Sequence, residues 1–122
     1  MLTRHTDGSG YYIRAFNQNS IQIGQDIYQQ SLIISTNELI TDWTLKTLHD
    51  LVYADFELAE NLNPDILIFG SGEKLRFPDF TIIRQLRAKG ISLEVMDTAA
   101  ACRTFNVLRS EERHVVAALL LD

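Results

Sequence analysis

The tripeptide Gly70-Ser71-Gly72 is the part of this sequence best suited to hold a small anion. It follows a continuous apolar run, residues 66–69, which is typical of a strand buried on both faces. A helix is expected to follow it, and such loops between strand and helix are where open α/β sheets bind ligands. The backbone N–H groups of a loop of this kind can converge on an anion, and Lys74 and Arg76 are close in the sequence.

Two interpretations of this loop stay open, a ligand-binding loop and a structural turn. The loop lacks both the Gly-Lys-Ser/Thr ending of a Walker-type phosphate loop and the six-residue dinucleotide fingerprint. Thr98 follows the next expected strand, where it either caps a helix or lines one cleft together with the loop. The candidate ligand-binding residues are therefore Gly70, Ser71, Gly72, Lys74, Arg76 and Thr98.

The remaining reactive side chains do not form a catalytic pattern. Ser71 is not placed in a Gly-x-Ser-x-Gly elbow, so a serine hydrolase is not indicated. The histidines His5, His49 and His114 have no metal-ligand spacing. Cys102 is the only cysteine, which excludes an intrachain disulfide, and its place in a helix favours a buried, inert thiol. We therefore expect no catalytic site, no metal and no cofactor.

The first third of the chain reads as β-structure. Short strand-like runs separated by Asn- and Gly-containing turns indicate an antiparallel meander. The expected strands are residues 11–16, 20–24, 27–28, 31–34 and 39–43.

The rest of the chain alternates helices with strands. Asp55 is expected to cap a short helix over residues 56–61. Pro78 suits the first turn of a second helix that ends at Gly90, with an inner face formed by Phe80, Ile83, Leu86 and Arg87. The strands over residues 66–69 and 91–96 flank this helix and should be parallel. A third helix, residues 99–108, is capped by Asp97 or Thr98 and leads to a final strand over residues 113–121; its direction is open, and antiparallel pairing is favoured.

Composition and charge describe one globular domain. The chain has 122 residues, of which 46% are hydrophobic and 22% charged, so we expect a single domain over residues 1–122 with residues 1–10 as a flexible tail. A net charge of −5 argues against nucleic acid as the main partner. No apolar run approaches the ~20 residues that cross a bilayer, and the first residues lack a signal peptide's apolar core, so the expected location is the cytoplasm.

The charges are unevenly distributed along the chain. Residues 38–65 contain seven acids and one base, whereas residues 74–109 contain seven bases and three acids. Two solvated faces explain this distribution, and a charged docking surface is the alternative.

The order and spacing of many short motifs resemble those of one known family. The motifs are the run over residues 64–72, Pro78, Leu86, Gly90-Ile91, Glu94, Met96, Thr98, Ala101, Thr104, residues 106–108, Glu111, Arg113 and residues 115–119. The family consists of small bacterial and archaeal proteins of unassigned biochemistry, and its mitochondrial member is the third-named assembly factor of respiratory complex I (NADH:ubiquinone oxidoreductase). The resemblance covers nearly the whole chain.

The resemblance implies a three-layer α/β fold, with a central mixed β-sheet, helices on one side and an additional β layer from the N-terminal meander. It implies no established activity, cofactor or catalytic residue. The function expected from it is a non-catalytic, protein-binding module similar to an assembly factor, with a partner in a membrane-associated complex. A small-ligand or anion-binding protein that uses the Gly70-Ser71-Gly72 loop, an unrecognised enzyme included, is the alternative. The sequence leaves open whether the protein is a monomer or a homodimer.

Overall fold

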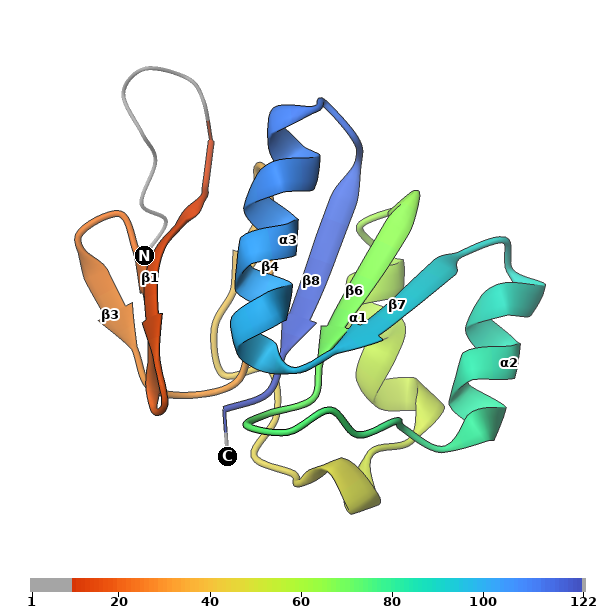
Figure 1. The fold of residues 1–122 in the computed structure, drawn as a ribbon. Helices are drawn as coiled ribbons and strands as arrows, with labels where there is room; N and C mark the ends of the chain where they lie inside the picture. The colour runs from red at the N-terminus through yellow and green to blue at the C-terminus, as the bar shows by residue number, and fades with distance from the viewer. Residues whose placement is uncertain (1–9, 122) are drawn as a thin grey trace.

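The computed structural model describes residues 10–121, and over that range the strands form two sheets (Figure 1). The smaller is an antiparallel sheet of three strands in the order β1-β2-β3. The larger, here called the central sheet, has five strands in the order β5-β4-β8-β6-β7. The expected flexible tail lies almost entirely in residues 1–9, outside the described residues, and stays a prediction, as does the single domain.

The elements follow the expected order along the chain. The strands are β1 (Ile13–Asn17), β2 (Ser20–Ile23), β3 (Asp26–Tyr28), β4 (Leu32–Ser35), β5 (Leu39–Ile40), β6 (Ile66–Gly70), β7 (Ser92–Met96) and β8 (Val115–Leu119). The helices are the 3₁₀ helices η1 (Leu48–Asp50) and η2 (Tyr53–Phe56) and the α-helices α1 (Glu57–Glu60), α2 (Phe80–Ala88) and α3 (Thr98–Ser110).

The central sheet is mixed, as expected from its connections. The strands β6 and β7, which flank α2, are parallel with Ile66 opposite Ser92, and this confirms the β-α-β prediction. The final strand β8 pairs antiparallel with β4 but parallel with β6. The favoured antiparallel direction is therefore right for one neighbour and wrong for the other, because the crossover through α3 returns β8 in the direction of β6 and β7.

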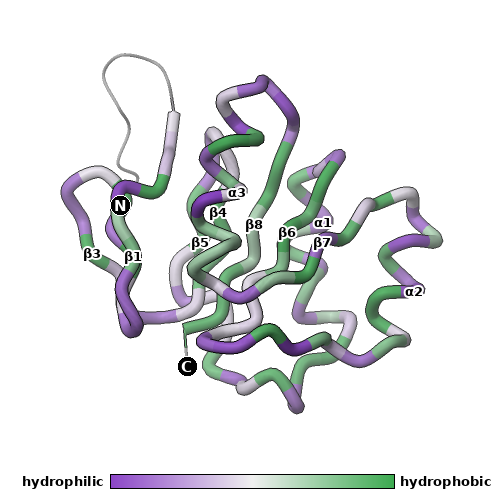
Figure 2. Tube along the Cα trace, in the orientation of Figure 1, coloured by the Kyte–Doolittle hydropathy of each residue, from purple (hydrophilic) through white to green (hydrophobic). Residues whose placement is uncertain are grey.

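Side chains of the central sheet alternate between two apolar clusters, one on each face. Leu67 and Phe69 of β6 face the cluster that includes η1, η2, α1 and α2, whereas Ile68 faces the cluster shared by α3 and the three-stranded sheet. Figure 2 shows β6 and β8 in the hydrophobic colour over most of their length, as expected for strands covered on both faces. The structure confirms the α/β class with a mixed central sheet and a separate β layer. The prediction that the helices lie on one side is wrong for α3, which packs on the same face as the β layer, whereas α1 and α2 cover the other face.

The helix α2 begins and turns differently from the sequence prediction. Its N-cap is Asp79, whose Oδ1 accepts from the Thr81 N–H at 2.8 Å, so Pro78 precedes the helix instead of opening it. Ile82 and Leu86 are buried, and Phe80, expected on the inner face, is 63% exposed. Apolar residues occupy both sides of this short helix, so its periodicity alone left the phase open.

One glycine and two aspartates were predicted to mark the ends of helices. Gly90, with φ +81°, follows the C-cap residue Lys89 at the predicted end of α2, and its N–H donates to the Arg87 carbonyl at 2.9 Å. Asp97 caps α3, since its Oδ1 accepts from the Ala100 N–H at 2.8 Å. Asp55 does not cap the short helix α1: it lies inside η2, and its carboxylate accepts from the Val52 N–H at 2.8 Å.

Within residues 10–121, no helix is long and apolar enough to cross a membrane.

Candidate functional site

The structure brings Thr98 into direct contact with the Gly70-Ser71-Gly72 loop. The loop leaves the end of β6, and Thr98 opens α3 directly after β7. The Thr98 hydroxyl accepts from the Gly72 N–H at 2.8 Å and donates to the Leu120 carbonyl at 2.8 Å. The Thr98 N–H in turn donates to the Gly72 carbonyl at 2.9 Å. This buried threonine therefore joins the ends of β6, β7 and β8.

The side chain of Ser71 closes the turn that follows. Its hydroxyl donates to the Lys74 carbonyl at 2.6 Å and accepts from the Arg76 N–H at 3.0 Å. The side chains of Lys74 and Arg76 are exposed, whereas Ser71 is fully buried. The serine hydroxyl is thus committed to main-chain partners and has no route to a substrate.

The donors that an anion would need are largely used within the protein. The Ser71 N–H donates to the Met96 carbonyl at 2.9 Å, and the Gly72 N–H is taken by Thr98. Two N–H groups of this loop therefore point at internal acceptors, and a bound anion would depend on the side chains of Lys74 and Arg76. Ligand binding at this loop stays a prediction.

Gly70 is needed for close packing and not for its backbone conformation. It ends β6, and it is not among the glycines with positive φ in the described chain, whereas Gly72 has φ +102°. A Cβ added at Gly70 would lie 2.9 Å from the Thr98 Oγ1 and 3.0 Å from the Leu119 Cδ2. Glycine is therefore required at this position by the close contacts with Thr98 and Leu119.

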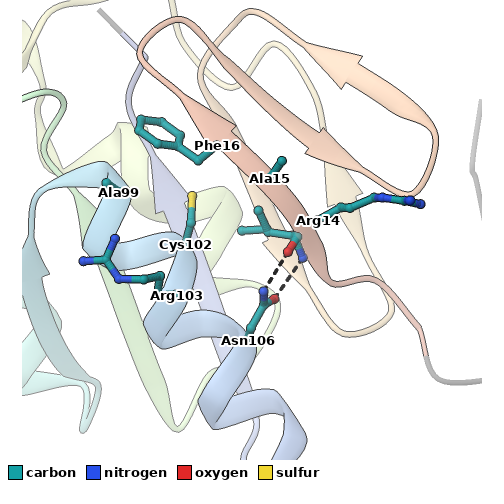
Figure 3. A pocket seen from close by; sticks show the side chains of 8 residues that line it. Arg14, Ala15, Phe16, Ala99, Cys102, Arg103 and Asn106 are labelled. Atoms are coloured by element: carbon teal, nitrogen blue, oxygen red, sulfur yellow. Dashed lines mark hydrogen bonds between the residues drawn. The ribbon is translucent and has the colours of Figure 1, made fainter.

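A cavity of about 310 Å³ lies between β1 and α3. Figure 3 shows the Asn106 side chain of α3 directed at β1, where it accepts from the Ile13 N–H at 2.9 Å and donates to the Ile13 carbonyl at 2.7 Å. The side chains of Arg14 and Arg103 extend away from each other in Figure 3, so their cations do not converge on one ligand. This cavity therefore belongs to the packing interface between the three-stranded sheet and α3.

Cys102 also lines this cavity, and its environment keeps the thiol protonated. Burial raises the pKa of Cys102 to about 12, although the nearby Arg103 cation acts in the opposite direction. A thiol with so high a pKa carries almost no thiolate near neutral pH, and thiolate is the reactive form. The expectation of a buried cysteine is confirmed.

A larger groove, about 540 Å³, runs between the two 3₁₀ helices and α2. Apolar and polar side chains from three segments meet in it; they are Leu48, His49, Leu51, Val52, Tyr53, Phe77, Asp79, Thr81, Ile82 and Gln85. Val52 is 52% exposed and Phe77 is 63% exposed, so two large apolar side chains lie at the surface of one groove. We call this the η–α2 groove. Sequence reasoning missed it, because its walls come from segments nearly thirty residues apart; the only available signal was the closely spaced Phe77 and Phe80 around a helix start.

An aromatic cluster holds the 3₁₀ segment in place beneath this groove. The rings of Trp43, Phe56 and Phe69 meet edge to face, with centroids 5.5–6.5 Å apart. The indole N–H of Trp43 donates to the Asp55 carbonyl at 2.6 Å. The segment that forms one wall of the groove is therefore attached to β6 of the central sheet through the ring of Phe69.

Two acidic residues of the segment over residues 38–65 form ion pairs with lysines. Asp55 forms an ion pair with Lys46 at 3.0 Å, and Glu60 with Lys89 at 2.8 Å. The Tyr53 hydroxyl also donates to Glu60, and the hydrogen bonds from Lys89 and Tyr53 hold the pKa of Glu60 below its usual value. These pairs connect η2 and α1 to neighbouring segments.

The relatives of this chain carry different names. It is 39% identical over 83 residues to "NADH dehydrogenase [ubiquinone] 1 alpha subcomplex assembly factor 3" of Xenopus tropicalis, an alignment that covers 66% of this chain and 45% of that protein. It is 30% identical over 96 residues to the "13 kDa major membrane protein" of Francisella tularensis, covering 78% and 76%. The chain thus spans about half the length of the Xenopus relative.

A solved structure and a family model agree with these sequence matches. The NMR structure of a Xanthomonas campestris protein matches with a TM-score of 0.84 and 34% identity, covering 98% of this chain and 91% of the other. The model of the family described as "Protein of unknown function (DUF498/DUF598)" matches residues 13–120. A match over nearly all of the described residues, together with the shared fold, shows that the chain belongs to the DUF498/DUF598 family.

Proposed function

We propose that this protein is a non-catalytic protein-binding module with a role like that of an assembly factor, and that its partner docks in the η–α2 groove. The observation that carries the proposal is the apolar rim of that groove, where Val52 and Phe77 expose more than half of their surface. Covering apolar surface is favourable by roughly 25 cal/mol per Å², so these side chains favour a partner that buries them.

The charges beside the groove indicate the chemistry of that partner. Asp79 lines the groove, and hydrogen bonds from Thr81 keep its pKa below the usual value, so it is ionised near neutral pH. Asp50, the last residue of η1, and Glu57, the first residue of α1, are exposed as well. A partner surface with apolar side chains and a basic flank matches this arrangement.

The relatives support this class of function. Several carry the name of an assembly factor, and assembly requires binding to other proteins. Because the chain spans only part of their length, the partners of those longer proteins are not transferred to it. The polar groups that the sequence suggested for chemistry, Ser71 and Thr98, are occupied by main-chain partners. A binding role accounts for the exposed apolar rim without requiring chemistry.

The test is capture of partners by tagged protein expressed in its own cells, followed by mass spectrometry. The double variant Val52→Ser with Phe77→Ser should recover at least about tenfold less of the main partner, while its melting temperature stays close to that of the wild type, because both side chains are mostly exposed. Leu45→Ser is the matched control, since Leu45 is 86% exposed and does not line the groove.

A second pair of variants tests the charge. Charge reversal of Asp50 and Glu57 to lysine should weaken capture of the same partner without lowering the melting temperature. If both double variants recover the wild-type partners at wild-type levels, the groove is not the docking site.

A further inference from the structure

The outer edge of β7 presents main-chain groups that no hydrogen bond in the described residues uses. In the order of the central sheet, β7 is the last strand, and its only neighbour among the described strands is β6 (Figure 1). The Met96 carbonyl accepts from the Ser71 N–H at 2.9 Å, so the main-chain groups of Met96 face β6. Successive residues of a strand point these groups to opposite sides. The N–H and C=O groups of Leu93 and Val95 therefore face outward, and within residues 10–121 they have no partner.

The open edge has defined ends and two different flanks. At one end the Ile91 N–H, which points to the same side, donates to the Leu86 carbonyl at 3.2 Å and belongs to the cap of α2. At the other end the Asp97 carbonyl accepts from the Ala101 N–H inside α3. Between these ends, Leu93 and Val95 pack against the apolar cluster on the α2 face. The exposed Glu94 points to the opposite face.

A second copy of the chain is disfavoured at this edge by Glu94. Two β7 strands that pair antiparallel use all the outward groups only when Leu93 of each lies opposite Val95 of the other. That register centres on Glu94 and places the two Glu94 side chains directly opposite each other at a non-hydrogen-bonded position, where Cα atoms are about 4.5 Å apart. Like charges in this position are destabilising, and charges on edge strands are a common device against edge-to-edge pairing.

We propose that β7 accepts an extended segment of a partner protein as a sixth strand of the central sheet, with a lysine or arginine of that segment opposite Glu94. The inference rests on the proposed protein-binding function and adds a second contact site with a stated chemistry. Leu93 and Val95 supply the main-chain hydrogen bonds, and Glu94 supplies the charge that selects a basic residue. Apolar residues that flank this basic residue in the partner segment would extend the cluster beneath α2.

A defined peptide tests the proposal on the isolated protein. The probe is acetyl-Thr-Val-Lys-Val-Thr-amide added to ¹⁵N-labelled protein, with the peptide that has glutamate in place of lysine as the matched control. The amides of Leu93 and Val95 should shift and exchange with solvent at least about tenfold more slowly, and the glutamate peptide should bind at least about fivefold more weakly. Unchanged Leu93 and Val95 amides at millimolar peptide, or equal binding of the two peptides, would overturn the proposal.

Proline substitutions separate the edge from the fold. Val95→Pro removes an N–H that faces outward, so the variant should fold but lose peptide binding. Glu94→Pro removes an N–H that bonds to β6 and should lower the melting temperature. If Val95→Pro does not fold, Glu94→Lys takes its place and should reverse the preference between the two peptides. The proposal is overturned if folded Val95→Pro binds the lysine peptide as the wild type does, or if Glu94→Lys does not reverse the preference between the peptides. It is also overturned if the wild type sediments as a dimer and the two copies pair through β7.

The groove variants distinguish this site from the docking groove. Val52→Ser with Phe77→Ser should bind the lysine peptide as the wild type does, because neither side chain belongs to β7. If the lysine peptide does not bind the wild type, only the strand-addition proposal is refuted. Wild-type partner capture by both this variant and the Asp50 and Glu57 charge-reversal variant refutes only the groove as a docking site.

Discussion

Removal of the Asn106 side-chain amide should loosen the attachment of the three-stranded sheet to α3. Asn106 makes two hydrogen bonds to the main chain of Ile13, at 2.9 and 2.7 Å, and both are partly buried. The pairing of β1 with β2 shifts register between Ile13 and Ala15, so the amide supports the strand where its ladder is irregular. A hydrogen bond of this kind contributes a net 0.5–1.5 kcal/mol, and Asn106→Ala should therefore lower the free energy of unfolding by about 1–3 kcal/mol.

Urea unfolding followed by the fluorescence of Trp43, the single tryptophan, measures this change. Ser110→Ala is the matched control on the same helix, because its exposed hydroxyl donates only to the Val107 carbonyl one turn away; a change within about 0.5 kcal/mol is expected. In Asn106→Ala, amides of β1 should also exchange faster with solvent than those of β6. If Asn106→Ala is as stable as Ser110→Ala, the two hydrogen bonds give no net stabilisation and the reasoning is refuted.

Three further predictions concern buried or paired groups. Gly70→Val should lower the free energy of unfolding by about 1–3 kcal/mol, because the new Cβ would meet Thr98 at 2.9 Å; a melting temperature equal to that of the wild type would contradict this. With its pKa raised to about 12, Cys102 should react with an aromatic disulfide at pH 8 only after unfolding, and prompt labelling of the native protein would show an accessible thiolate. Glu60 has a lowered pKa because Lys89 donates to it, so its stabilisation is complete above its unfolded pKa and is lost as pH falls through the lower folded value. The melting-temperature difference between wild type and Glu60→Gln should therefore shrink between about pH 5 and about pH 3, and a constant difference would refute the pairing.

The sequence predicted those features that depend on neighbours along the chain. A continuous apolar run indicated that β6 is buried on both faces, and Gly90 after a helical pattern indicated the end of α2. With a helix between two strands, the handedness of the crossover makes β6 and β7 parallel, as the structure shows. Asp97 or Thr98 was predicted to cap α3, and Asp97 is the cap, because a carboxylate before a helix can accept its free N–H groups. These inferences hold because their physical causes act over a few residues.

Other features depended on which segments meet in space. The exposure of Phe80 and the burial of Ile82 follow from where α2 lies on the sheet, and its own sequence is compatible with either phase. The Ser71 and Gly72 N–H groups looked free for a ligand until the structure placed Met96 and Thr98 against them. The sequence of a loop does not reveal which distant residues accept hydrogen bonds from its N–H groups, because those residues come close only in the folded protein.

The surfaces proposed for binding were decided by tertiary structure alone. The η–α2 groove joins segments around residues 48–53 and 77–85, and the direction of its side chains depends on the aromatic packing of Trp43. The outward direction of the Leu93 and Val95 amides depends on the register of β7 against β6, and a shift of one residue would turn them inward. The sequence by itself therefore determined the kinds of elements and most of their order, because propensity, capping and periodicity are local. Packing and register, which are set by residues distant in the chain, decided which groups remain available to a partner.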